Sequence, residues 1–122
     1  MRIQVLRVDD PEGHILCDTP GGRLTAAWRG DTRPAPGDAA DVEIDAVGNL
    51  RWGTTVTVID QVAQSPLANT FIGVAEEVHG DEVLVRADGL LRITVGGSVP
   101  DNIVGQSVAV SPESFELWPT GI

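Results

Sequence analysis

The sequence predicts an all-β protein that consists of two tandem, OB-like small β-barrels related by internal duplication. Three observations support this fold class. Apolar and polar residues alternate in segments of strand length, landmarks of the first half recur roughly 67 residues later, and no segment keeps a helical period for three turns. The strands expected from this pattern are separated by turns rich in glycine and proline, as in sandwiches and small barrels.

The alternation is clearest near the end of each half. Val42 and Ile44 alternate with acidic side chains, and Val108 and Val110 alternate with small or polar ones. The acidic positions are Asp41, Glu43 and Asp45. Because successive side chains of a strand point to opposite faces, this pattern predicts strands with one buried and one solvated face.

The duplication is visible when residues 1–53 are laid over residues 70–121. The matched landmarks are residues 2–5 with 71–74, Gly13 with Gly80, residues 22–24 with 89–91, Gly37 with Gly105, Leu50 with Leu117, and Trp52 with Trp118. We therefore predict a first barrel over residues 1–53, a connecting segment over 54–69 and a second barrel over 70–122.

The connecting segment carries its own signals. Residues 54–59 are rich in β-branched side chains, which favours a further strand there. The only helical candidates are single turns, at residues 101–104 and around 61–68.

Composition excludes several classes of partner. The net charge is −10, all eight basic residues are arginine, and they are scattered along the chain. Because affinity for a phosphate backbone depends on clustered cations, we expect no binding to nucleic acid and none to anionic membranes. We find no signal-peptide pattern and no apolar run of about 18 residues. We therefore expect a cytoplasmic location and no insertion into a membrane.

Three segments carry a resemblance to a known family. Residues 36–44, from Pro36-Gly37-Asp38 to Val42 and Ile44, and residues 104–117 resemble the closing strands of TOBE and Mop-like domains. Residues 65–69, which precede Gly73, are similar to the Ser-x-Arg-Asn stretch of a Mop domain, with Ala68 in place of the arginine. The resemblance implies OB-like barrels in tandem that act as regulatory modules or bind oxyanions such as molybdate.

Ser65, Asn69 and Ser98 are the candidate ligand-binding residues. Hydroxyl and amide donors, together with backbone N–H groups, suit a tetrahedral oxyanion and do not require a basic protein. The alternative interpretation is that these polar side chains cap a turn of the connecting segment.

The sequence predicts no catalytic residues, no metal site and no cofactor. His14 and His79 lack metal-ligand spacing to Cys17 or to each other, and both fall in predicted turns. Cys17 lies in an apolar stretch, which predicts a buried, unreactive thiol. No motif provides a base or an oxyanion hole for a nucleophile.

The three tryptophans are candidates for packing or recognition. Trp52 and Trp118 recur at the ends of the two halves and are expected to plug a barrel end or to lie between the barrels. Trp28, with Arg29 beside it, is of the type that anchors protein interfaces, although core packing also fits it. The sequence therefore predicts a non-catalytic binding or regulatory module that contacts another protein, with a basic protein as one candidate, or self-associates. The alternative function is binding of a small oxyanion of the molybdate or tungstate type.

Overall fold

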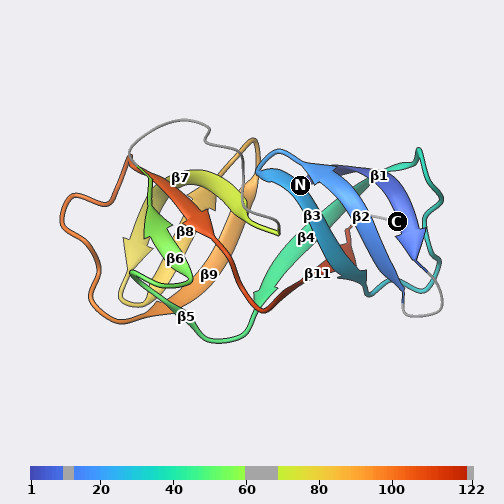
Figure 1. The fold of residues 1–122 in the computed structure, drawn as a ribbon. Helices are drawn as coiled ribbons and strands as arrows, with labels where there is room; N and C mark the ends of the chain where they lie inside the picture. The colour runs from blue at the N-terminus through green and yellow to red at the C-terminus, as the bar shows by residue number, and fades with distance from the viewer. Residues whose placement is uncertain (10–12, 60–68, 121–122) are drawn as a thin grey trace.

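The computed structural model describes residues 1–9, 13–59 and 69–120, and these residues form strands, turns and loops without any helix. The strands make two barrel-like sheets that lie side by side (Figure 1). This confirms the predicted all-β class and the two small barrels. The described part of the chain contains no helix that could cross a membrane.

Barrel 1 is a closed sheet of five strands in the order β1-β2-β3-β11-β4. Its strands are β1 (Arg2–Asp9), β2 (His14–Thr19), β3 (Gly22–Trp28), β4 (Ala39–Val47) and β11 (Ser114–Pro119). Every residue of β11 pairs antiparallel with β4, and β11 also pairs parallel with β3 at two positions. β4 also pairs with β1, through residues 39–41 at its start, whereas β11 pairs with residues 42–47.

Barrel 2 is a six-stranded sheet in the order β5-β9-β8-β7-β10-β6. Its strands are β5 (Leu50–Arg51), β6 (Val56–Val58), β7 (Phe71–His79), β8 (Glu82–Arg86), β9 (Leu90–Gly96) and β10 (Ser107–Val110). An isolated bridge between Trp52 and Val56 links the two edges of this sheet. The second barrel is therefore nearly closed.

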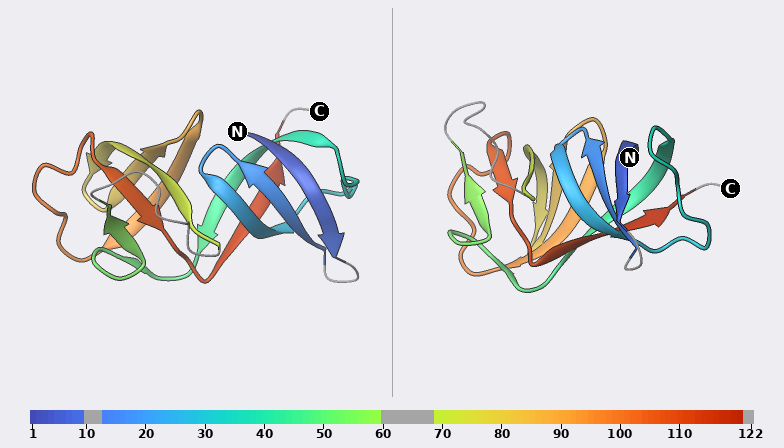
Figure 2. Two further views of the ribbon diagram at one scale, coloured as in Figure 1. Left: turned by 45° about the horizontal axis from the view of Figure 1, so that its top comes forward. Right: turned by 45° about the vertical axis from the view of Figure 1, so that its right-hand side comes forward.

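The two barrels exchange their closing strands. β11, at the end of the second half, completes barrel 1, whereas β5 and β6, which follow β4, belong to barrel 2. In the two views of Figure 2, the red end of the chain runs from barrel 2 into barrel 1. The continuous ranges 1–53 and 70–122 expected from the sequence thus differ from the barrels by this exchange. The alternation of apolar residues encodes which face of a strand is buried, but it does not encode which strand lies beside it.

The strand pairing of the first half recurs in the second, but one residue away from the sequence match of residues 2–5 with 71–74, because Val5 corresponds to Ala75 and not to Val74. β1 and β2 pair with a bulge between Val5 and Arg7, and β7 and β8 pair with a bulge between Ala75 and Glu77. The loop before the fourth strand repeats as well, because Gly37 N donates to Val5 O and Gly105 N donates to Ala75 O, both at 2.8 Å. Bulges bend a strand strongly, so the same bulge in both halves gives both sheets the same curl.

A continuous apolar core runs through both barrels. Gly21, in the β2–β3 turn, lies against the ring of Phe71 at the start of β7, and a Cβ atom at Gly21 would be 2.4 Å from that ring. Gly21 O also accepts a hydrogen bond from Ile72 N at 2.8 Å. Only glycine allows this close approach, which joins barrel 1 to barrel 2.

Two local predictions concern the connecting regions. The strand expected within residues 54–59 is present as β6. Residues 101–104 contain a turn rather than a helical turn, and Asn102 there has a φ of 56°. Most of the other expected helical turn, around 61–68, lies outside the described residues.

Candidate functional site

A hollow on the described surface lies between the barrels. This cleft has a volume of about 350 Å³ and is lined by Glu43, Ile44 and Asp45 of β4 and by Leu84, Leu90 and Arg92 of β8 and β9. We call it the β4 cleft. β4 presents Glu43 and Asp45 outward because Val42 and Ile44 alternate with them into the core of barrel 1. One wall is therefore acidic and the other is largely aliphatic.

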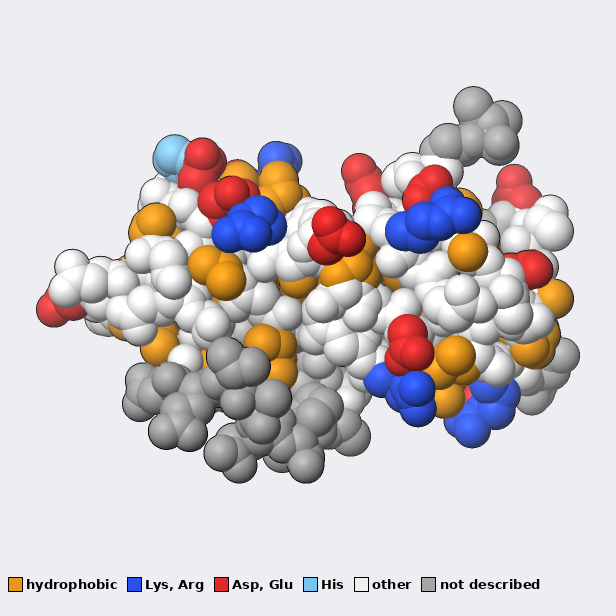
Figure 3. Space-filling view, turned by 90° about the horizontal axis from the view of Figure 1, so that it is seen from above, with side chains coloured by type: hydrophobic (Ala, Val, Ile, Leu, Met, Phe, Trp, Pro, Cys, Tyr) orange, Lys and Arg blue, Asp and Glu red, His pale blue; other side chains and the backbone are white. Residues whose placement is uncertain are grey.

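Several carboxylates of the described surface have no ion-pair partner among the described residues, and two of them line the β4 cleft. Within the described part of the chain, arginines of both barrels form ion pairs with carboxylates, and Figure 3 shows blue side chains beside red ones over both barrels. Among the described residues, Glu43 and Asp45 have no such partner. Arg92, across the cleft, lies 3.8 Å from Glu82. The cleft thus keeps an excess of negative charge.

Two large apolar side chains are exposed at this cleft or beside it. Leu90 is 53% exposed, and Trp118 is 44% exposed. Trp118 pairs directly with Glu43 across β11 and β4, and residues opposite each other in an antiparallel ladder share a face. An exposed tryptophan therefore lies next to the acidic wall, where a partner could contact both.

The three candidate ligand residues are not brought together. Asn69 precedes β7, whereas Ser98 is exposed after the end of β9, and β7 and β9 run parallel because both pair antiparallel with β8. At about 3.3 Å per residue, β9 separates the two positions by roughly 20 Å. Ser65 lies outside the described residues. The oxyanion hypothesis stays a prediction without an assembled site in the described structure.

Asn69 has a structural contact instead. Its Oδ1 accepts a hydrogen bond from the backbone N of Thr25 at 2.9 Å, and its φ is 60°. The next residue, Thr70, is buried and shares a hydrogen bond of 2.8 Å with Ser111 Oγ. These contacts agree with the alternative interpretation, in which polar side chains hold the end of the connecting segment.

Trp28 and Arg29, the predicted interface residues, both have contacts within the chain. Trp28 is half-buried, and its Nε1 donates to Thr32 O at 2.9 Å. Arg29 Nε donates to Glu116 Oε2 at 2.7 Å. An interface role for these residues stays a prediction, and nothing in their surroundings favours it over packing.

The other tryptophans differ from each other. Trp52 packs against the core, and its buried Nε1 has no hydrogen-bond partner among the described residues. Trp118 is exposed, so its expected role as a plug is wrong: it lies on the outer face of β11, which faces away from the core.

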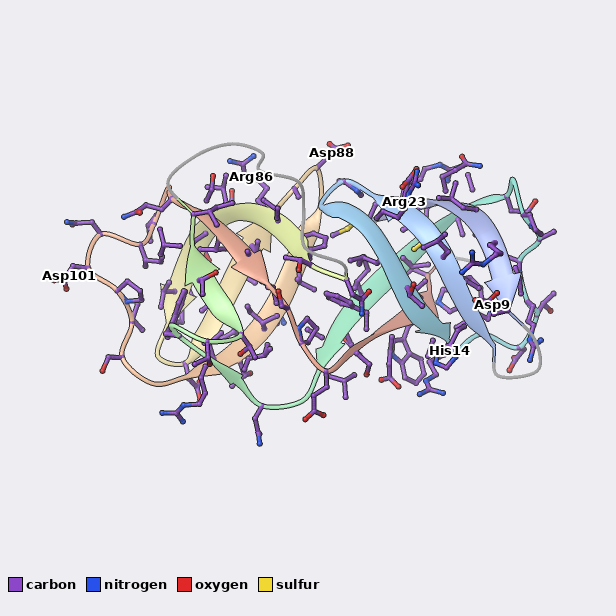
Figure 4. The ribbon with its side chains drawn as sticks, in the orientation of Figure 1. Asp9, His14, Arg23, Arg86, Asp88 and Asp101 are labelled. Atoms are coloured by element: carbon purple, nitrogen blue, oxygen red, sulfur yellow. The ribbon has the colours of Figure 1, made fainter. Side chains whose placement is uncertain are left out.

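The described residues contain no group of three or more histidine, cysteine or acidic side chains that could hold a metal ion. Cys17 is fully buried, and burial, with a smaller effect from Asp18, raises the pKa of its thiol to about 12. Such a thiol stays protonated and is a poor nucleophile. His79 lies 3.2 Å from Glu77 on the surface, and His14 lies at the end of barrel 1 far from barrel 2 (Figure 4).

Sequence reasoning did not select the β4 cleft, although two signals pointed to it. The acidic face of residues 40–46 was visible in the alternation. In the repeat, Leu90 also replaces Arg23, so that a leucine stands on a solvated face. What the sequence did not show is that β4 of one barrel faces β8 and β9 of the other.

Comparison of the chain with protein-family models, with curated proteins and with solved structures gave no match.

Proposed function

We propose that this protein is a non-catalytic binding module that contacts another protein, and that its contact surface is the β4 cleft with Trp118 beside it. The observation that carries this proposal is the combination of exposed Leu90 and Trp118 with the carboxylates of Glu43 and Asp45, which have no ion-pair partner among the described residues. Protein interfaces concentrate their binding energy in aromatic and aliphatic anchors surrounded by polar groups.

The charge of the chain favours a basic partner. The net charge is −10, and within the cleft lining two carboxylates face a single arginine. An acidic surface accelerates association with a basic protein and repels nucleic acid. Salt screens this attraction over a Debye length of about 8 Å at physiological ionic strength, so association should slow as salt is added.

The test is affinity capture at low salt, followed by measurement of the dissociation constant for each purified partner. We compare the wild-type chain with Trp118→Ala and with the double variant Glu43→Gln/Asp45→Asn. The matched control is Asp81→Asn/Asp101→Asn, which removes the same charge; Figure 4 places Asp101 at the tip of barrel 2 farthest from barrel 1. Loss of an anchor residue weakens hot-spot contacts by about 2 kcal/mol or more, so we expect a loss of affinity of about 30-fold for Trp118→Ala.

Several outcomes would contradict the proposal. A partner that binds the cleft variants and the wild type equally would remove the β4 cleft from consideration, and loss of binding in Trp28→Ala alone would move the contact to the surface predicted from the sequence. Sub-micromolar binding to single-stranded DNA or RNA at physiological salt would refute the class of partner. Sedimentation of the same variants tests whether the partner is a second copy of this chain.

A further inference from the structure

The outer face of β4 and β11 places an exposed aromatic ring among carboxylates. Trp118 is 44% exposed and pairs with Glu43 across the two strands. Glu116, on the same face of β11, pairs with Asp45. Side chains directly opposite each other in an antiparallel pair have Cβ atoms about 5 Å apart, and the next pair on the same face follows after about 7 Å. We call these four residues the Trp118 face, and its indole ring lies within side-chain reach of three carboxylates.

The carboxylates on either side of the central pair already bind arginines of the chain. Arg29 Nε donates to Glu116 Oε2 at 2.7 Å. Arg2 Nη1 lies 3.2 Å from Oδ1 of Asp41, which shares the outer face of β4. Glu43, between these two ion pairs, has no such partner among the described residues. The negative charge directly beside the ring therefore remains for a partner to neutralise.

The neighbouring carboxylate decides between an apolar and a cationic occupant of the ring. An apolar side chain on Trp118 would remove water from Glu43 without giving its carboxylate a hydrogen bond, and burial of an unpaired charge is costly. A cation gains from both groups, because the face of an aromatic ring is electronegative and tryptophan attracts cations more strongly than other aromatic residues. We therefore expect the side chain that rests on Trp118 to be cationic.

Arginine satisfies this geometry better than lysine. A guanidinium is planar, so its face can stack on the indole while N–H groups at its edge donate two parallel hydrogen bonds to the neighbouring carboxylate. The lysine ammonium is a compact and strongly hydrated point charge without such a face. A second copy of this chain is disfavoured as the source of the cation, since each copy carries a net charge of −10.

We propose that the Trp118 face binds an arginine of the basic partner, whose guanidinium stacks on the Trp118 indole and donates to Glu43. This inference rests on the proposed function, because it names the residue by which the partner is recognised at that surface. Asp45 adds to the attraction from the neighbouring pair of residues, whereas the charge of Glu116 is already neutralised by Arg29.

Two end-blocked peptides of equal charge test the inference, one with arginine and one with lysine between two alanines. In ¹⁵N-resolved NMR titrations at low salt, the three indole N–H signals of the chain report on different surroundings. Trp28 Nε1 donates to Thr32 O and Trp52 Nε1 is buried, so these two signals serve as internal controls. We expect the arginine peptide to shift the Trp118 signal and to bind about fivefold more tightly than the lysine peptide.

Variants separate the two parts of the contact, with the backbone amide signal of residue 43 as the readout. Trp118→Leu keeps an apolar side chain but removes the ring, so it should abolish the preference for arginine over lysine. Glu43→Gln should weaken the binding of both peptides by about tenfold, because it removes a charge-assisted hydrogen bond. Asp101→Asn, at the tip of barrel 2 (Figure 4), should leave both affinities unchanged. Circular dichroism and the urea midpoint verify that each variant is folded.

The outcomes separate this inference from the proposed function. Equal affinity of the two peptides, or shifts confined to the signals of Trp28 and Trp52, would overturn the stacked arginine while cleft-dependent capture of a partner still stood. A Trp118 signal that moves when the concentration of the chain alone is raised would identify a second copy as the occupant and overturn it as well. If capture of the partner is insensitive to the cleft variants, the proposed function fails and this inference fails with it.

Discussion

Barrel 1 and barrel 2 are built from the same repeat but are closed in different ways. One continuous strand, β11, closes barrel 1 and pairs with six consecutive residues of β4. Barrel 2 is closed by two pieces, β5 and β6, with residues 52–55 between them. The two short strands suffice to close the barrel because each contributes one buried residue. Leu50 of β5 pairs with β9, and Val56 of β6 pairs with β10. Burial of these two positions, rather than an unbroken strand, is what the second barrel requires.

The outer faces of the two barrels differ more than their cores. Cys17 and Val85 are both fully buried at equivalent positions, as are Leu24 and Leu91. On the solvated face, Asp18 pairs with Arg23 in barrel 1, whereas Arg86 lies opposite Leu90 in barrel 2. The buried residues are thus similar in the two halves of the repeat, whereas the exposed residues that a partner would contact differ.

The largest effect is expected at the closing strands. Leu117 is fully buried in continuous β11, and Leu50 occupies the corresponding position in the short β5. Leu→Ala at buried positions costs about 2–5 kcal/mol. We expect Leu117→Ala to reduce the free energy of unfolding by about 4 kcal/mol and Leu50→Ala by about 2 kcal/mol, because a two-residue strand can relax around the cavity. Urea unfolding measures both, and equal losses would show that the split closure is as rigid as the continuous one.

The next effect concerns the junction between the barrels. Gly21→Ala places a methyl group against the buried ring of Phe71, and overpacking of this kind costs about 1–3 kcal/mol. Replacing the ring by a smaller side chain in Phe71→Leu should relieve the clash. The double variant should therefore lose less stability than the sum of the losses in the two single variants. A double-mutant cycle in urea measures this coupling. Strict additivity would mean that the contact does not hold the barrels together.

A smaller effect is expected at Asn69, which contacts Thr25 of β3. Asn69→Ala removes the acceptor of Thr25 N and puts alanine at a φ of 60°, which together cost about 1–2 kcal/mol. Asn69→Gly removes only the hydrogen bond and should cost less. Thermal unfolding with and without molybdate measures both roles of Asn69. A molybdate-dependent increase in Tm that Asn69→Ala abolishes would restore the oxyanion function.

The smallest effect is expected for the cross-strand ion pair of barrel 1, which is exposed. The hydrogen bond from Arg23 holds the pKa of Asp18 below its ordinary value. A lowered pKa in the folded state means that the pair stabilises the protein above the unfolded pKa of about 3.9, and that this contribution is lost as the pH falls through the folded pKa. Asp18→Asn should therefore lower the urea midpoint slightly at pH 7, and the difference from wild type should vanish at low pH. A difference that persists at low pH would point to a cause other than charge.

The sequence alone predicted the all-β class, the two small barrels and a few buried positions. The alternation around Val42, Ile44, Val108 and Val110 predicted strands that the structure contains, and the match of Leu50 with Leu117 survives as two equivalent buried residues. These features follow from the two-residue period of a strand, which is a local property of the chain.

Only the tertiary structure decided which strands lie side by side. The exchange of β11 with β5 and β6, the juxtaposition of Glu43 with Leu90 and Arg92, and the exposure of Trp118 all depend on contacts between distant segments. Hydrophobic alternation specifies the inner and outer faces of a strand but is satisfied equally by either barrel, since both cores accept the same aliphatic residues. The candidate site lies between the two barrels, and its residues therefore meet only after the exchange has placed β4 opposite β8 and β9.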